Sequence, residues 1–272
     1  MNARRPDREA DGFRDLARPE SARADSGLAP AGRVMTSYEV FAPFYDRVMG
    51  DRGREGVFLQ ELIKRHRPEA ATVLELACGT GAILEQLHSH YEVSGLDASK
   101  RMLDVAAQKV PEARLFREDM TRVALDETFD VVLCVFDSIN HLVRFADWEA
   151  VFDRAHEHLT DRGIFIFDVN TERKLAAFAS APPWTQWFDD DSLLLIEVRD
   201  EGSGVYGWKL RVFEHRSGSG YRLHVEDIRE ATFPLERIKA SLAERFGRVR
   251  VYDAERARPT TRSLRLHLVC EG

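Results

Sequence analysis

The sequence predicts an α/β protein built on a doubly wound, mostly parallel sheet. Buried strand patterns alternate with amphipathic helical patterns from residue 72 to residue 169, as in successive β-α-β units. A glycine turn, Gly79-Thr80-Gly81, separates the first strand from the helix that follows it. After residue 170 strand patterns follow one another across short turn clusters. This change from strand–helix alternation to successive strand patterns predicts an antiparallel β insertion after strand five.

Each element follows from its local pattern. Seven strands are expected in the main sheet, at residues 72–76, 92–96, 113–117, 129–136, 163–169, 248–252 and 263–269. Helices are expected at two segments within 35–66, from the glycine turn to about residue 90, and at residues 99–109, 147–159 and 234–246. The antiparallel insert spans about residues 184–233, with strand patterns at residues 192–200, 204–216 and 221–233.

Composition narrows the class of protein. The 272 residues include 39 Lys and Arg against 46 Asp and Glu, which gives a net charge of −7 and argues against a nucleic-acid partner. No run of apolar residues is long enough to cross a membrane, so no membrane partner is expected. The three cysteines, Cys78, Cys134 and Cys270, have no metal-binding spacing, so no metal site is expected. A cytoplasmic location is the expectation.

The first 34 residues differ in composition from the rest of the chain. They contain seven Arg and six acidic residues but few large apolar ones. Such a segment buries too little apolar surface to offset the entropy of ordering it. We expect residues 1–34 to be a disordered N-terminal extension and residues 35–272 to form the folded domain.

The glycine turn carries the strongest chemical signal. It follows a buried strand that contains Glu75, and Asp97 stands at the end of the next strand, 22 residues after Glu75. A glycine turn, a helix N-terminus and a strand-end acid together indicate an adenosine-containing cofactor. A dinucleotide is disfavoured because Leu84 occupies the third glycine position of that motif and Glu75 would repel a pyrophosphate. An acid that faces the ligand suits a cofactor with a positive ammonium group.

These motifs together resemble those of the class I S-adenosylmethionine-dependent methyltransferases. The segment 75–81, Glu-Leu-Ala-Cys-Gly-Thr-Gly, matches their first motif, with Ala77 in place of the commoner glycine. The resemblance implies the Rossmann-like methyltransferase fold, with S-adenosylmethionine bound by Glu75, Ala77, Gly79, Gly81, Asp97, Asp119, Met120 and Val135. Asp119 also fits a solvated loop, and Met120 fits the core equally well.

A narrower resemblance concerns the substrate. Tyr45-Asp46, the segment 50–53 and the segment 136–141 are similar to bacterial N-methyltransferases that act on nucleotide-linked amino sugars. The resemblance implies that Tyr45 and Arg52 hold the methionine part of the cofactor and that His141 lies next to the methyl acceptor. The segment 167–170 and the insert depart from the pattern of that group.

Several functions are compatible with these patterns. The favoured one is methyl transfer to the amine of an amino sugar or a related natural-product intermediate, and O-methylation of a small molecule is the alternative. His141 then either accepts a proton or orients the acceptor. A nucleic-acid methyltransferase is disfavoured because residues 137–140 lack the D/N-P-P-Y/F motif. A catalytically silent cofactor-binding protein is disfavoured by the intact cofactor motifs. The number of methyl groups transferred and the oligomeric state, with a homodimer as one option, stay open.

Overall fold

A computed structural model describes residues 38–50, 52–189, 191–218, 220–256 and 258–272. The extension expected at residues 1–34 lies outside the described residues, as do residues 35–37. Within the described part, two separate β-sheets are formed, one of seven strands and one of four.

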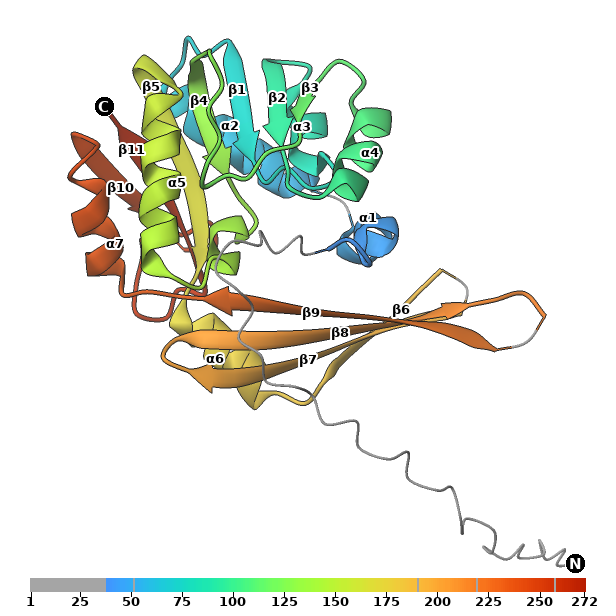
Figure 1. Ribbon diagram of the computed structural model, residues 1–272. Coiled ribbons are helices and arrows are strands. Elements are labelled where there is room, and N and C mark those ends of the chain that lie inside the picture. Colours follow the sequence, from blue (N-terminus) through green and yellow to red (C-terminus); the bar gives the residue numbers. More distant parts are fainter. Residues whose placement is uncertain (1–37, 51, 190, 219, 257) are drawn as a thin grey trace, which may run out of the picture. The chain divides into compact units, whose positions relative to one another are not determined.

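The seven-stranded sheet has the strand order β10-β11-β5-β4-β1-β2-β3 (Figure 1). Its strands are β1 (Thr72–Leu76), β2 (Glu92–Leu96), β3 (Arg114–Phe116), β4 (Phe129–Cys134), β5 (Leu159–Asn170), β10 (Arg248–Tyr252) and β11 (Arg265–Glu271). The first five run parallel, whereas β11 pairs antiparallel with both β5 and β10. The prediction of a doubly wound, mostly parallel sheet is confirmed, and all parallel strands end at the same edge.

Helices cover both faces of this sheet because its central strands are apolar on both sides. Adjacent residues such as Val73 and Leu74 face opposite cores, as the two-residue period of a strand requires. Residues of α5 (Phe145–Glu157) and α7 (Leu235–Leu242) pack into one core. Those of α2 (Gly53–His66), α3 (Ala82–Leu87) and α4 (Lys100–Lys109) pack into the other. Every helix of this set lies at or near a position that the apolar pattern predicts.

The four-stranded sheet is antiparallel throughout, with the order β6-β7-β8-β9. Its strands are β6 (Trp184–Phe188), β7 (Ser192–Gly202), β8 (Val205–His215) and β9 (Tyr221–Ala231). One of its faces forms a third core with Phe41, Phe44 and Val48, which come from the region of η1 (Ala42–Phe44) and α1 (Tyr45–Met49). The expected antiparallel insertion after strand five is confirmed.

Some boundaries differ from the sequence expectation. Helix α6 (Glu172–Ser180) and strand β6 are additional, because each buries few residues and so leaves only a weak apolar pattern. Strand β4 ends at Cys134 rather than Phe136, since Phe136 and Asp137 take the left-handed backbone conformation with φ of 59° and 54°. This turn directs the chain into η2 (Ser138–His141) beside the end of the sheet.

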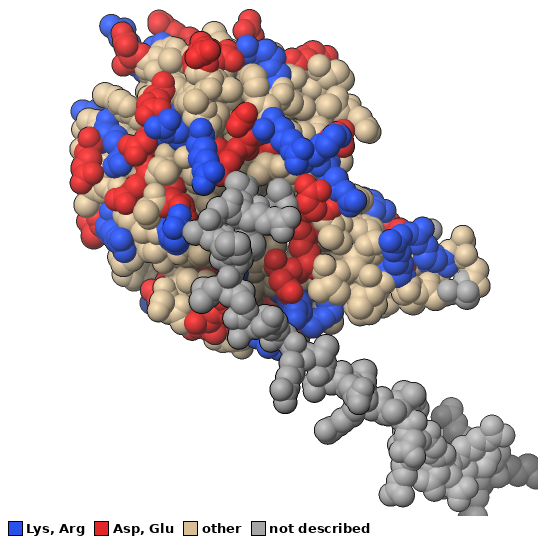
Figure 2. Space-filling model, viewed as in Figure 1, with Lys and Arg blue, Asp and Glu red and all other residues tan. Residues whose placement is uncertain are grey.

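The surface mixes charges of both signs. Lys and Arg side chains lie among Asp and Glu side chains on the face shown in Figure 2. Within the described residues, no helix combines the length and apolar character that are needed to cross a bilayer.

A buried asparagine joins the two sheets. Asn140 of η2 is fully buried, and its side-chain Oδ1 accepts a hydrogen bond of 2.9 Å from the Asn170 backbone N–H at the end of β5. Its Nδ2 donates to the carbonyl of Ala231 at the end of β9, at 2.8 Å, and to the carbonyl of Asn170 at 3.3 Å. One amide group therefore fixes the end of the insert to the carboxyl edge of the main sheet.

Replacing this amide should destabilise the protein. In Asn140→Ala the Asn170 N–H and the Ala231 carbonyl lose their partner, and each buried unsatisfied group costs about 1–3 kcal/mol. We expect urea unfolding to show a loss of about 2–4 kcal/mol. Ser138→Ala removes one hydrogen bond, to the Val135 carbonyl, from the same half-buried loop and serves as the control, with a loss of about 1 kcal/mol or less. Equal losses in the two variants would contradict the joining role of Asn140.

Candidate active site

The glycine turn forms the floor of the candidate site. Three residues that follow β1 have positive φ: Ala77 at 54°, Gly79 at 54° and Gly81 at 73°. Gly81 is the N-terminal cap of α3, so the turn presents the start of that helix at the carboxyl edge of the sheet. A Cβ added to Gly79 would meet no atom within 4 Å beyond its chain neighbours. The backbone at Gly79 is therefore open to close approach by a ligand.

Asp97 ties this turn to the end of β2. Its Oδ2 accepts a hydrogen bond of 2.9 Å from the Gly79 N–H, and its Oδ1 accepts one of 2.8 Å from the Ser99 N–H. Burial raises the pKa of the Asp97 carboxyl, and these backbone donors oppose the shift. Each carboxylate oxygen retains a second lone pair, so the group has the acceptor capacity to bind two hydroxyls.

Glu75 is a buried carboxyl that pairs with no cation among the described residues. Its side chain is in the buried interior at 3% exposure, and Oε2 has no hydrogen-bond partner among the described residues. Burial, followed by the nearby Asp97, raises the pKa of Glu75 well above its usual range. A buried carboxylate becomes favourable when a positive group reaches it. The site therefore fits a ligand that brings an ammonium group to Glu75.

Residues from several distant segments line one cavity above the glycine turn. They are Tyr45, Arg52, Glu75, Ala77, Cys78, Gly79, Thr80, Ala82, Ile83, Val135, Phe136 and Ser138. The Arg52 guanidinium lies over the Phe136 ring, 4.4 Å from its centroid. Burial raises the pKa of Tyr45 to about 12, so its phenol is neutral at physiological pH. Tyr45 of α1 and Arg52, the N-cap of α2, thus form part of the cavity wall.

The structure brings together most of the residues expected to bind the cofactor. Tyr45, Arg52, Glu75, Ala77, Gly79 and Val135 line this cavity, and Gly81 and Asp97 belong to the turn beside it. Asp119 and Met120 lie outside the lining. The Asp119 carboxylate accepts hydrogen bonds from the backbone and hydroxyl of Thr121, and Met120 packs against the main core. Their expected contact with adenine stays a prediction.

His141 lies at the end of η2, where the insert meets the main sheet. Its Nδ1 is 3.2 Å from the carbonyl of Arg229 on β9, and its Nε2 is 3.2 Å from the Tyr38 hydroxyl. A carbonyl only accepts, so Nδ1 carries the proton and Nε2 accepts from Tyr38 in the neutral ring. Burial lowers the pKa of His141, although Asp137 opposes this shift. The imidazole is thus held neutral, with both nitrogens engaged.

Sequence reasoning missed four residues around His141 and its neighbour Asp137. Tyr38 comes from the start of the described chain, Glu230 from β9, Asp168 from β5 and Arg265 from β11. Arg265 forms ion pairs with Asp137 and with Asp168, the latter at 2.9 Å. These residues lie far apart in the chain, and none belongs to a motif, so only the folded arrangement shows that they are neighbours.

Comparison with known proteins agrees with this geometry. Residues 73–163 match the model of the family described as "Methyltransferase domain". A protein of Bacillus subtilis named "Putative methyltransferase YqeM" is 30% identical over 212 residues, which cover 75% of this chain and 84% of that protein. The chain belongs to the S-adenosylmethionine-dependent methyltransferase family. The family resemblance inferred from the motifs is confirmed, and S-adenosylmethionine is the cofactor that this site fits.

Two further relatives of this methyltransferase are informative. A Streptomyces fradiae protein named dTDP-3-amino-3,6-dideoxy-alpha-D-glucopyranose N,N-dimethyltransferase is 36% identical over 132 residues. The alignment covers 47% of this chain and about half, 52%, of that relative. The sugar N-methyltransferase KedS8 from Streptoalloteichus sp ATCC 53650 has a TM-score of 0.74 at 21% identity, covering 92% of this chain and 99% of its own. At that identity the likeness shows the shared fold.

The two glycines of the turn should respond differently to alanine. Both have positive φ, so either substitution costs about 1–2 kcal/mol of backbone strain. A Cβ at Gly81 would also lie 3.1 Å from the Ala106 Cβ of α4, whereas one at Gly79 meets open space. We expect Gly81→Ala to lose more unfolding free energy and Gly79→Ala to lose more affinity for S-adenosylhomocysteine, measured by calorimetry. Wild-type affinity in Gly79→Ala would contradict close approach of the cofactor.

Glu75→Gln should separate stability from binding. Burial raises the pKa of Glu75 in the folded protein. Below the unfolded pKa of about 4.3 the carboxyl is neutral in both states and does not change the free energy of unfolding. As the pH rises above that value, the unfolded state loses the proton more readily, so Glu75 destabilises the free protein. The variant should therefore be more stable than wild type at neutral pH, with a smaller difference near pH 4. It should also bind S-adenosylmethionine about tenfold or more weakly. A Glu75→Gln variant that loses both melting temperature and affinity would contradict an ammonium-binding role for Glu75.

Proposed function

We propose that the protein transfers the methyl group of S-adenosylmethionine to the amine nitrogen of a small molecule, with a nucleotide-linked amino sugar as the substrate class. The observation that carries this proposal is the state of His141. The imidazole has both nitrogens engaged, and burial disfavours its protonated form. A hydroxyl acceptor needs a base as its proton leaves, and His141 is poorly placed to be that base. An amine needs only to arrive neutral and aligned.

The catalytic work is then mainly positioning. The bound cofactor supplies an electrophilic methyl carbon, and alignment of the acceptor against it is worth about 7–11 kcal/mol by effective molarity. In this proposal Glu75 holds the ammonium group of the methionine part, and Tyr45 and Arg52 cover that part. Asp97 accepts the ribose hydroxyls, and His141 orients the acceptor from the insert side. The rigid placement of His141 by Tyr38 and β9 supports this role.

The relatives support an amine acceptor. The name of the Streptomyces fradiae protein states that it methylates the amine of a dTDP-linked amino sugar, and its matched segment is about half of this chain. Other relatives are named malonyl-[acyl-carrier protein] O-methyltransferases, which keeps transfer to an oxygen as the alternative that the test must address.

The test uses dTDP-3-amino-3,6-dideoxy-D-glucose as acceptor and mass spectrometry of the product. Wild-type protein should add methyl groups to the nitrogen. His141→Ala should reduce kcat/KM by less than about 100-fold, because orientation rather than proton transfer is lost, and His141→Asn should recover part of the loss. The affinity for S-adenosylhomocysteine should not change in either variant.

Tyr38→Phe is the matched variant, because it removes only the hydroxyl bound to His141 Nε2. We expect it to raise KM for the acceptor with little change in kcat. Methylation of a hydroxyl in place of the nitrogen would show that the acceptor class is wrong. A loss above about 100-fold in His141→Ala that His141→Asn does not recover would show that His141 acts as a base.

A further inference from the structure

Glu230 is a buried carboxyl at the end of the insert that the reaction described above does not use. It lies near the end of β9 at 3% exposure. Its Oε2 accepts a hydrogen bond of 3.0 Å from the Asn170 side chain. Among the described residues no hydrogen bond reaches Oε1 and no cation forms an ion pair with Glu230. One carboxylate oxygen is therefore available to an incoming ligand.

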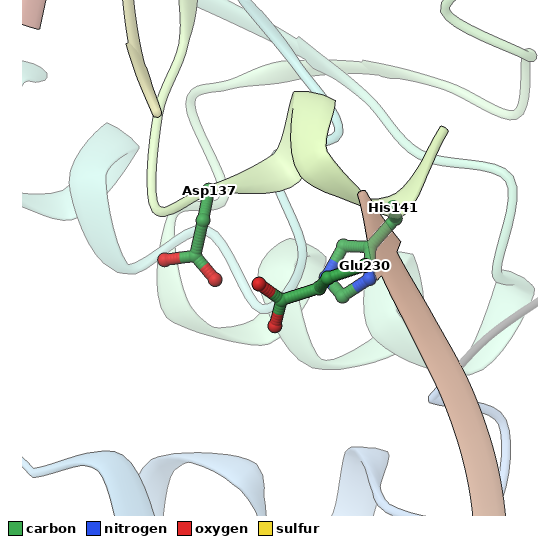
Figure 3. A group of neighbouring side chains, drawn as sticks. All are labelled: Asp137, His141 and Glu230. Atoms are coloured by element: carbon green, nitrogen blue, oxygen red, sulfur yellow. The ribbon is translucent and has the colours of Figure 1, made fainter. Parts of the chain in front are cut away.

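Glu230 belongs to a cluster that borders the cofactor cavity. One oxygen of Glu230, one oxygen of Asp137 and one ring nitrogen of His141 lie within 4.8 Å of one another. Figure 3 shows the Glu230 carboxylate directed toward the gap between Asp137 and His141. Asp137 stands between Phe136 and Ser138, both of which line the cofactor cavity. A group that enters this cluster is therefore next to the place where the cofactor binds.

The cations nearest to Glu230 are bound to other groups. Arg265 is engaged by Asp137 and Asp168, and the Lys174 ammonium donates to the Asn170 Oδ1 at 2.8 Å. The titratable groups that face Glu230 are Asp137 of the turn after β4, His141 of η2, Tyr38 of the N-terminal segment, Lys174 of α6 and Arg265 of β11. Burial, followed by Asp137, raises the pKa of Glu230 to about 8. At this pKa the free carboxyl is mostly protonated near pH 7, and a cationic ligand placed beside it favours the carboxylate form, which can accept a proton.

The cluster suits an ammonium group better than a divalent metal ion. Both nitrogens of His141 are already engaged, and Asp137 is paired with Arg265. The Arg265 guanidinium would repel a dication placed between these groups, and a metal bound through one His141 nitrogen would break the hydrogen bond that this nitrogen makes. A primary ammonium group instead offers up to three donors to the oxygens that face the gap.

We infer that Glu230 contacts the amine of the acceptor and removes one proton from its ammonium form. This inference rests on the proposed function. In the step, one N–H bond of the ammonium breaks and its electron pair stays on nitrogen, while an O–H bond forms at Glu230 Oε1. The neutral amine then has the lone pair with which it attacks the methyl carbon. The proton passes from Glu230 to solvent when the product leaves, so the carboxylate is restored for the next acceptor.

A pH profile of Glu230→Gln tests this role. With dTDP-3-amino-3,6-dideoxy-D-glucose as acceptor, the variant should lose about 100-fold or more in kcat/KM near pH 7. The loss should shrink as the pH rises above the pKa of the acceptor amine, because the amine then arrives neutral. Asp227→Asn, an exposed change on the same strand, should follow the wild-type profile. Calorimetry with S-adenosylhomocysteine should give wild-type affinity in both variants, which shows that they are folded.

Each other outcome decides a different claim. A wild-type protein that fails to methylate the nitrogen overturns the proposed function and, with it, the role of Glu230. An active wild type with a Glu230→Gln loss that is absent, or is the same at every pH, overturns the role of Glu230 alone. Activity that is abolished by EDTA and restored by a divalent metal assigns the cluster to a metal and also overturns it. If Glu230→Gln does not bind S-adenosylhomocysteine, Glu230→Asp takes its place because it keeps the carboxylate. The pH profile of Glu230→Asp should have the wild-type shape, and a shifted profile overturns the role of Glu230.

Discussion

The arrangement of the site depends on the buried hydrogen bonds of Asn140. This one amide connects the loop after β4, the end of β5 and the end of β9. The carboxyl edge of the main sheet holds the cofactor turn, and β9 carries Glu230 and the carbonyl that orients His141. Because buried polar groups are expensive to leave unpaired, Asn140 fixes the distance between the two halves of the site. The insert is thus attached to the edge of the main sheet that carries the candidate site.

Two buried carboxyls lie on either side of the Asn140 hydrogen bonds and define the chemistry there. Glu75 lines the cavity, and Glu230 lies at its border with one oxygen free of hydrogen bonds within the described chain. Among the described residues, neither carboxyl forms an ion pair. Burial raises the pKa of both groups, so each is unfavourable in the free protein and is stabilised by a positive ligand. In our proposal, burial of a carboxyl therefore serves the cofactor's ammonium group at one end and the acceptor's ammonium group at the other. The proposal implies that the free protein loses stability at both carboxyls and regains it when the two cations bind.

Sequence patterns predicted the sheet and the cofactor turn because their signals are local. The strands around Gly79 are buried on both faces, and Glu75 and Asp97 stand at fixed offsets from strand ends. The acceptor side was predictable only as far as His141. Tyr38, Glu230 and Arg265 reach it through tertiary packing of segments about 100 residues apart, which no periodicity or spacing encodes. Helix α6 and strand β6 were missed because they bury few side chains, so tertiary contacts rather than local pattern decide them.

The most direct test of this account is a crystal structure of the protein with S-adenosylhomocysteine and a dTDP-linked amino sugar. The account predicts that the cofactor's amino group contacts Glu75 and that its ribose hydroxyls contact Asp97. It also predicts that the sugar nitrogen lies between Glu230 and His141, in line with the sulfur. A sugar nitrogen outside this cluster, or a cofactor amino group away from Glu75, would contradict it.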